Sequence, residues 1–218
     1  TGEILALMDG KTITAMRTGA VTGVSIRHLA KADTQSVGIV GCGVQSYYQI
    51  MYACTARDIR SITLFDIDPT AVSALIEKLR TDAIMPPLPS AIEIQVAEST
   101  AALAQASDIV VTATTARAPV FPNDPALFEG KHCVAIGSFE PEVREYPDAL
   151  FSLVEKVWID TDFASEESGE LMIPMQKGIL HEEQLETLGH FIQSGRAPER
   201  GGHGTTFFKS VGMAMFDL

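Results

Sequence analysis

The sequence predicts an α/β protein built on a doubly wound, mostly parallel sheet. Short apolar runs rich in β-branched residues alternate with longer segments of helical periodicity through most of the chain. The first of these runs is followed at once by a glycine-containing turn. Strands that alternate with helices pair in parallel, because each helix carries the chain back across the sheet, and the helices then cover both faces.

The stretch from Ser36 to Asp66 contains the most specific pattern. Its parts are, in order, a strand (37–40), a turn (Gly41-Cys42-Gly43), a helix (44–56) and a second strand (62–65). Gly41 permits the tight turn, and Gly43 lets a pyrophosphate approach the backbone. The N-terminus of the helix offers unpaired N–H groups and a positive dipole end to the phosphates. We therefore predict a dinucleotide-binding (Rossmann) site, although Ser46 replaces the third glycine; the alternative is a glycine turn in another kind of α/β domain.

Asp66 predicts which dinucleotide binds. It lies roughly 20 residues beyond the turn, where a carboxylate accepts both ribose hydroxyls. A carboxylate at this position repels a 2′-phosphate, and no Arg or Lys occurs in the next several residues. We expect NAD rather than NADP.

The other elements follow from periodicity and from residues that cap or end them. Asp68 is suited to cap a helix over 69–80, with Pro69 at its first position. Further strands are expected over 92–96, 108–112, 131–136 and 156–160, and further helices over 14–31, 99–106, 146–153 and 185–192. The acidic stretch 162–170 is interpreted as a solvated face. The small polar cluster Ala113-Thr114-Thr115 follows a strand at the rim where ligands of such sheets lie.

The two chain ends fall outside the alternation of strands and helices. An apolar run over 4–8, the turn signal Asp9-Gly10 and an extended piece from Ile13 predict a hairpin. Residues 205–208 are expected to be extended and 209–218 helical. We divide the chain into 1–33, part of a substrate-binding and dimerisation domain with a linking helix; 34–196, the dinucleotide-binding domain; and 197–218, which returns to the first domain. A ligand pocket is expected between these parts.

Composition limits the possible partners and compartments. The chain has 218 residues, a net charge of −12 and 46% hydrophobic residues. This acidic balance argues against binding to nucleic acid or anionic membranes, which require basic surface. The three cysteines are odd in number and scattered, so we expect reduced thiols and a cytoplasmic protein. Cys42 at the helix N-terminus is interpreted as a small residue filling the turn rather than as a reactive thiol. No Cys/His spacing suggests a metal site.

Arg17 is the candidate substrate-binding residue near the N-terminus. An arginine on a helix that leads into the nucleotide-binding domain is able to clamp a carboxylate with two hydrogen bonds. From the residues alone, a surface or interdomain salt bridge is the preferred interpretation.

Several blocks of the sequence together resemble the ornithine cyclodeaminase/mu-crystallin family. They are TGEILALMDG, ITAMRTGA, GCGVQS, GSFEPEVRE and TFFKSVGMA, and they occur in the family's order over essentially the whole chain. The resemblance implies a two-domain NAD(P) enzyme that acts on a small amino or imino acid and forms a homodimer.

The resemblance also implies roles for individual residues. Arg17 matches the arginine that grips the substrate carboxylate beside the nicotinamide, so the functional interpretation becomes the preferred one, with Arg17 as catalytic and substrate-binding residue. The matched cofactor positions are Gly41, Gly43, Val44, Gln45, Asp66, Thr114, Ile136 at a strand end, and Ser210. Val211 falls where the family's returning segment lines the substrate pocket.

Two departures from the family pattern bear on the reaction. Phe139 and Val143 stand where cyclodeaminases carry an Asp and a Lys, and a phenyl ring accepts no proton. Glu140 and Glu142 are candidate replacement acids, although a solvated loop is the preferred interpretation. The block with Arg144-Glu145, and Lys209 in Phe-Phe-Lys-Ser, is closer to the mu-crystallin or reductase branch. The family's other substrate-grip residues, an Arg and a Lys, lie in an N-terminal portion that this sequence lacks, so we expect a fragment.

Three functions follow from these expectations. The first is an NAD-dependent oxidoreductase that reduces a cyclic ketimine such as pyrroline-2-carboxylate, or acts as an alanine dehydrogenase. The second is ornithine cyclodeaminase, a lyase that forms proline and ammonia. The third is a nucleotide-binding, crystallin-like protein without enzymatic activity.

Overall fold

The computed structural model describes residues 3–4, 7–82 and 85–217. Eight parallel strands form one sheet in the order β3-β2-β1-β4-β5-β8-β6-β7. The strands are β1 (Ser36–Val40), β2 (Ser61–Phe65), β3 (Glu93–Val96), β4 (Ile109–Thr112), β5 (His132–Ala135), β6 (Val157–Ile159), β7 (Leu185–Thr187) and β8 (Thr206–Lys209). The doubly wound, parallel fold class predicted from the sequence is confirmed.

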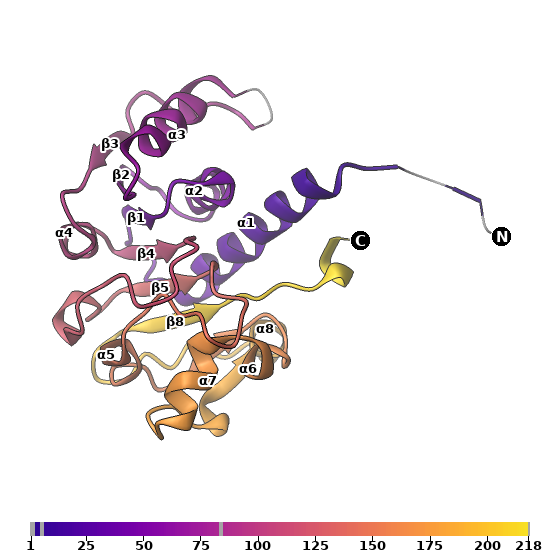
Figure 1. Ribbon diagram of the computed structural model, residues 1–218, viewed down its shortest axis with the longest axis vertical. Helices are drawn as coiled ribbons and strands as arrows, with labels where there is room; N and C mark the ends of the chain where they lie inside the picture. Colours follow the sequence, from indigo (N-terminus) through magenta and orange to yellow (C-terminus); the bar gives the residue numbers. More distant parts are fainter. Residues whose placement is uncertain (1–2, 5–6, 83–84, 218) are drawn as a thin grey trace.

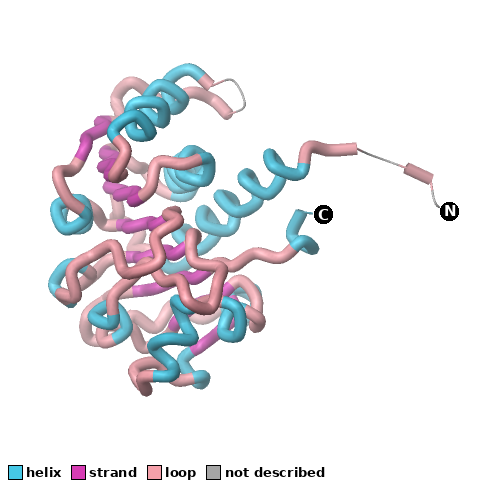
Figure 2. The backbone as a smooth tube through the Cα atoms, in the orientation of Figure 1, coloured by secondary structure: helices cyan, strands magenta, loops and turns pink. Residues whose placement is uncertain are grey.

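Helices cover both faces of the sheet (Figures 1 and 2). They are α1 (Gly10–Leu29), α2 (Val44–Ala56), α3 (Pro69–Thr81), α4 (Thr100–Gln105), α5 (Asp148–Phe151), α6 (Ala164–Glu167), α7 (Gly169–Gln176) and α8 (Leu188–Ser194), with short 3₁₀ turns η1 (Pro125–Leu127), η2 (Glu182–Gln184) and η3 (Ala214–Asp217). Alternate residues of each strand face opposite sides. Ile109 and Val111 therefore belong to the core cluster that includes residues of α1, α2, α3 and α8, whereas Val110 belongs to the cluster that includes residues of α4, α5, α6 and α7.

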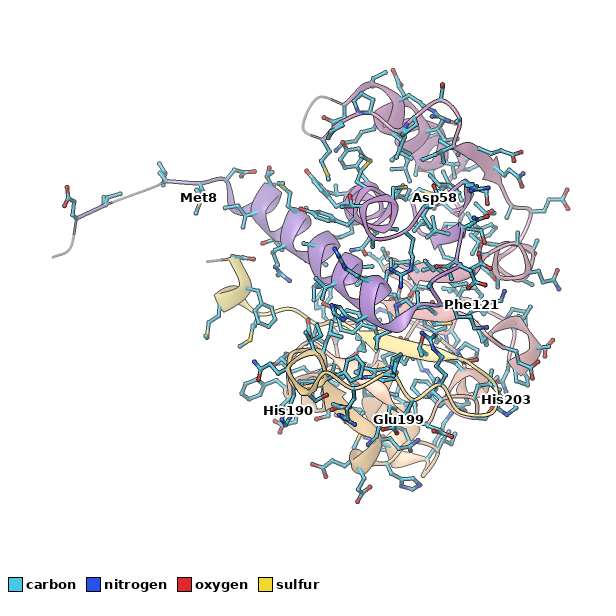
Figure 3. All side chains as sticks on the ribbon, turned by 180° about the vertical axis from the view of Figure 1, so that it is seen from behind. Met8, Asp58, Phe121, His190, Glu199 and His203 are labelled. Atoms are coloured by element: carbon cyan, nitrogen blue, oxygen red, sulfur yellow. The ribbon has the colours of Figure 1, made fainter. Side chains whose placement is uncertain are left out.

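The long helix α1 lies along α2 because small residues let the two backbones approach. A methyl group on Gly19 would come within 2.8 Å of the Tyr48 side chain, and one on Gly23 within 3.1 Å of Tyr52. Ahead of α1 the chain extends away from the body, where Met8 is 61% exposed (Figure 3). No helix in the described part of the chain is long and apolar enough to cross a membrane.

The N-terminal hairpin expected from the sequence is wrong for the described residues. Residues 3–4 and 7–9 form no strand, and 5–6 lie outside the described residues. Asp9 caps α1 by accepting the Thr12 N–H at 3.0 Å, so the helix begins at Gly10 and includes Ile13. An Asp-Gly pair suits both a turn and a helix start, and the helical stretch that follows decides between them.

Four expectations for the second half of the chain are also wrong. The stretch 162–170 is not merely a solvated face, because it forms α6 and the start of α7, and Glu170 is fully buried. The predicted helix over 185–192 is divided into the strand β7 and the helix α8. The extended piece 205–208 does not lie outside the sheet but enters it as β8 between β5 and β6, and the expected helix over 209–218 is only the turn η3.

Candidate functional site

Two hollows lie at the carboxyl ends of the strands. The strand order reverses between β1 and β4, where open parallel sheets bind their ligands. One hollow, of about 680 Å³, adjoins the glycine turn and Asp66. The other, of about 520 Å³, adjoins α1 and the ends of β4, β5 and β8. Both are lined by Ala113, Thr114 and Thr115, so the two hollows adjoin at this cluster after β4.

The glycine turn has the geometry that the sequence predicts. Gly41 has a φ of +89°, and a methyl group there would lie 2.6 Å from the Ala113 carbonyl oxygen. Gly43 is the N-cap of α2, and a methyl group there would have no neighbour within 4 Å, so its backbone faces open space. Ser46 is fully buried and its hydroxyl donates to the Gly41 carbonyl, which explains why a serine occupies the third glycine position.

Asp66 lies at the end of β2 and lines the larger hollow. One carboxylate oxygen accepts the Cys42 N–H at 2.6 Å and the other accepts the Asp68 N–H at 2.9 Å. The carboxylate thus ties the glycine turn to the end of β2 while adding negative charge to the hollow.

Cys42 is buried, and burial together with the neighbouring Asp66 carboxylate raises the pKa of its thiol to about 12. The thiol stays protonated, as expected for a residue that fills the turn. All three cysteines are free. In the part of the chain that the structure describes, no group of three or more His, Cys, Asp or Glu side chains is arranged to hold a metal ion.

The first residues of α2 point in different directions. Val44 is 72% exposed at the helix N-terminus and lines neither hollow. Gln45 lines the 520 Å³ hollow, and its Oε1 is buried without a hydrogen-bond partner among the described residues. A buried acceptor without a partner is costly, and a ligand with an N–H or O–H group would satisfy it.

The smaller hollow brings together residues from the two chain ends and the centre. Its lining includes six of the residues singled out from the sequence: Arg17, Gln45, Thr114, Ile136, Ser210 and Val211. Asp160, at the end of β6, shapes the segment after β8. It accepts the Ser210 hydroxyl at 2.6 Å, the Val211 N–H at 3.2 Å and the Gly212 N–H at 2.7 Å.

Arg17 forms a salt bridge and also lines the smaller hollow, so the structure fits both interpretations made from the sequence, the salt bridge and the substrate-binding residue. Its Nε donates to Asp217 at 2.8 Å, and the Thr14 hydroxyl donates to the other Asp217 oxygen at 3.0 Å, so a salt bridge between the chain ends is present. The two terminal guanidinium nitrogens make no hydrogen bond within the described residues, and Arg17 still lines the hollow. Gly212 has no side chain to obstruct them, since a Cβ there would overlap the guanidinium.

Phe139 is 65% exposed and lines the same hollow as Arg17. The neighbouring Glu140 lies 3.9 Å from the exposed Arg117, and Glu142 is exposed. Glu140 also lines the hollow, whereas Glu142 does not and belongs to the solvated loop of the preferred interpretation from the sequence.

With this geometry described, comparison with known proteins identifies the family. The model of the ornithine cyclodeaminase/mu-crystallin family matches residues 1–218. The chain belongs to this family.

Two relatives and one solved structure are similar to this chain over its whole length. Delta(1)-pyrroline-2-carboxylate reductase of Bacillus cereus is 32% identical over 220 residues, covering 100% of this chain and 65% of the relative. Alanine dehydrogenase of Archaeoglobus fulgidus is 28% identical, covering 100% of this chain and 64% of the relative. The structure of the Thermococcus litoralis Delta(1)-pyrroline-2-carboxylate reductase in complex with NADH and L-proline matches with a TM-score of 0.88 and 33% identity, covering 100% of this chain and 65% of that one. This chain thus spans just under two thirds of the length of these relatives.

Three charged residues near the strand ends are buried, and none of them was assigned a site role from the sequence. Glu145, Glu170 and Lys209 are all fully buried. Lysine and glutamate are rarely buried completely unless they are paired, so Lys209 directly after the apolar pair Phe207-Phe208 was a usable signal. Glu145 and Glu170 lie in loop-like or acidic sequence, where nothing local indicates burial.

The electrostatics of this cluster follow from burial. Burial and the nearby Glu145 carboxylate raise the pKa of Glu170 to about 7. Burial lowers the pKa of Lys209, while Glu145 and Glu170 oppose that shift. The Lys209 ammonium donates to the carbonyl oxygens of Ala135 at 3.3 Å and Ser210 at 2.8 Å.

Proposed function

We propose that this protein is an NAD(H)-dependent oxidoreductase that reduces a small cyclic imino acid, with pyrroline-2-carboxylate as the best-fitting substrate. The observation that carries the proposal is the pair of hollows that meet at Thr114. One has the glycine turn and a carboxylate suited to a ribose. The other has an arginine whose terminal nitrogens are available for a carboxylate.

The cofactor assignment rests on how the described residues fit it. Gly43 leaves the backbone at the start of α2 open to a pyrophosphate, and Asp66 lines the same hollow. The buried Oε1 of Gln45 has no hydrogen-bond partner among the described residues, and it fits a donor on a ligand. We propose that Val44 contributes through its backbone N–H, because its side chain lines neither hollow. Thr114, Ile136 and Ser210 would contact the nicotinamide half.

The chain's residues would position an imino acid as follows. The terminal nitrogens of Arg17 bind its carboxylate, while Asp217 holds Nε and fixes the direction of the guanidinium. Val211 and Phe139 line the hollow and offer apolar surface to the ring of the substrate. A bound NADH would supply a hydride for the imine carbon, and the imine nitrogen would take up a proton from water.

Phe139 favours reduction over cyclodeamination. Release of ammonia from ornithine requires a group that accepts a proton or orients water, and the phenyl ring offers neither. An imine that is already formed requires only the hydride and a proton. Alanine dehydrogenase is the second candidate, because the Archaeoglobus fulgidus relative has that name.

The test is turnover by purified protein, followed as NADH consumption. Pyrroline-2-carboxylate is compared with pyruvate plus ammonia, and ornithine plus NAD is assayed for proline and ammonia. Turnover of the cyclic imino acid alone is the expected result. Turnover of pyruvate alone would select alanine dehydrogenase, proline from ornithine would select cyclodeaminase, and NADH binding without any turnover would select the crystallin-like alternative.

We also propose a cytoplasmic homodimer whose substrate-binding and dimerisation domain includes residues from 1–33 and, from the return segment 197–218, the part that follows β8. The archaeal alanine dehydrogenase structure, 26% identical with a TM-score of 0.83, is described as a dimer with bound NAD. Light scattering on the purified protein tests the dimer, and a monomer at micromolar concentration would contradict it.

A further inference from the structure

Glu145 connects the ends of two neighbouring strands beneath the junction of the hollows. Its Oε1 accepts both the N–H and the hydroxyl of Thr114 at 2.8 Å, and its Oε2 accepts the N–H of Gly137 at 2.7 Å. Thr114 follows β4 and Gly137 follows β5. Because a carboxylate has acceptors only, one fully buried side chain satisfies three donors from two strand ends.

The backbone around Gly137 leaves no room for another arrangement. A Cβ on Gly137 would overlap the Thr114 carbonyl oxygen and lie 2.7 Å from Glu145 Oε1. The ends of β4 and β5 are therefore in close contact here, and the Glu145 carboxylate bridges them.

Glu145 is itself held from the opposite side by Glu170 on α7. The Glu145 N–H donates to Glu170 Oε2 at 2.6 Å, the Ser138 hydroxyl donates to the same oxygen at 3.1 Å, and the Tyr146 N–H donates to Oε1 at 3.0 Å. The chain of contacts runs from α7 through Glu145 to the residues that line the hollows. Apolar side chains of similar volume would hold a core together without the desolvation of two carboxylates and an ammonium.

The contacts of Thr114 determine what it presents to a ligand. Its hydroxyl proton is donated to Glu145, and its oxygen accepts the Ala116 N–H at 3.2 Å. One lone pair remains, so Thr114 is able to act toward a ligand only as an acceptor. The donors on the nicotinamide half of the cofactor are its carboxamide NH₂ and its ribose hydroxyls.

We propose that Glu145 is a positioning residue that fixes Thr114 as a hydrogen-bond acceptor and sets the width of the crevice for the nicotinamide half of the cofactor. The inference rests on the proposed function, because it takes the ligand of the crevice to be NADH. Glu145 touches neither cofactor nor substrate and acts only through Thr114 and Gly137.

The experiment compares NADH affinity with folding in Glu145→Gln, Thr114→Val and the double variant. In Glu145→Gln, the amide NH₂ faces the Gly137 N–H or the Thr114 N–H and hydroxyl, so two donors meet and a hydrogen bond is lost. We therefore expect the NADH dissociation constant, measured by calorimetry, to rise at least 10-fold. Thr114→Val keeps the shape and removes only the hydroxyl, so the protein should fold normally and lose a similar factor. Since both changes remove the same acceptor, the double variant should bind little more weakly than Glu145→Gln. Glu142→Gln, on the exposed part of the same loop, is the matched control and should bind NADH like the parent.

A purely structural role makes a different prediction. It lowers the unfolding midpoint of Glu145→Gln and leaves the NADH dissociation constant within twofold of the parent, and this result would overturn the proposal. If Glu145→Gln does not fold, Thr114→Val decides alone, and parental affinity in that variant would overturn it. Parental NADH binding without turnover of any imino acid would refute only the substrate assignment. A parent that binds no nicotinamide cofactor would refute both proposals.

Discussion

Gly43→Ala separates cofactor binding from folding more sharply than any other single change. The backbone of Gly43 has a φ of −80°, which alanine adopts without strain, and the added methyl group meets nothing within 4 Å. Alanine is a poorer N-cap than glycine, which costs roughly 0.5–1 kcal/mol. The smaller conformational freedom of the unfolded chain offsets about 0.4–1 kcal/mol. The unfolding midpoint should therefore move by no more than about 2–4 °C.

Cofactor binding should respond much more strongly to the same methyl group. The methyl group would occupy the open space through which, in the proposed function, a pyrophosphate would reach the N–H groups at the start of α2. A hydrogen bond to a charged group contributes about 1.5–3 kcal/mol. Losing one such bond weakens binding by about 10- to 100-fold.

Calorimetry with NADH and thermal unfolding followed by circular dichroism measure the two effects. Gly189→Ala is the control, because Gly189 is exposed on α8 and also has no neighbour within 4 Å. It should bind NADH like the parent and be as stable or slightly more stable. If Gly43→Ala binds NADH within twofold of the parent, the pyrophosphate does not lie against this backbone and the assignment of the turn fails.

Three further predictions concern the substrate, the choice of cofactor and the response to acid. Arg17→Lys replaces a fork of donors by a point charge and should raise the KM for the imino acid by about 10- to 100-fold with NADH affinity unchanged; an equal loss of NADH affinity would contradict its role. Asp66→Asn should weaken the binding of NADH about 10-fold and reduce the preference for NADH over NADPH, because the charge that repels a 2′-phosphate is removed. Calorimetry with each cofactor measures the two dissociation constants, and an unchanged ratio between them would show that Asp66 does not discriminate between the cofactors. Burial lowers the pKa of His132 from 6.5 to about 3, with the charges of Arg200 and Arg57 acting in the same direction. The neutral His132 therefore contributes fully to the free energy of unfolding above pH 6.5, and this contribution falls by up to about 1.4 kcal/mol per pH unit as the pH falls toward 3. In urea unfolding, the free energy of unfolding of His132→Gln should fall less steeply than that of the parent between pH 7 and pH 4.5. Equal slopes in the two proteins would refute this prediction.

The parts of the fold that were predicted correctly depend on local chemistry. Gly41 has a positive φ, Gly43 faces open space, and Asp68 caps α3. Each of these properties depends on a few neighbouring residues and is therefore predictable from the local sequence. Asp9 was misread because the same residue suits a turn or a helix cap, and the following helix decides. The position of β8 was missed because pairing between strands distant in sequence leaves no local pattern.

The candidate site shows the same division. The glycine turn and Asp66 followed from spacing, whereas Arg17, Ser210 and Val211 acquired roles only through the family resemblance. The structure places Arg17 and Val211 in one hollow although almost the whole chain separates them. Glu170 was interpreted as part of a solvated acidic stretch. Its burial depends on three hydrogen-bond donors from residues 138, 145 and 146, which are distant from it in sequence and which no local pattern reveals.

The place of β8 in the sheet has a consequence for biosynthesis. Among the described strands, β6 and β7 are joined to β5 through β8, which follows all of them in the sequence. Until the ribosome has released residue 209, the strands form two incomplete sheets with open edges. Nascent chains arrested before Thr206 should therefore remain sensitive to protease at β6 and β7, and early protection there would show that these two strands fold without their central neighbour.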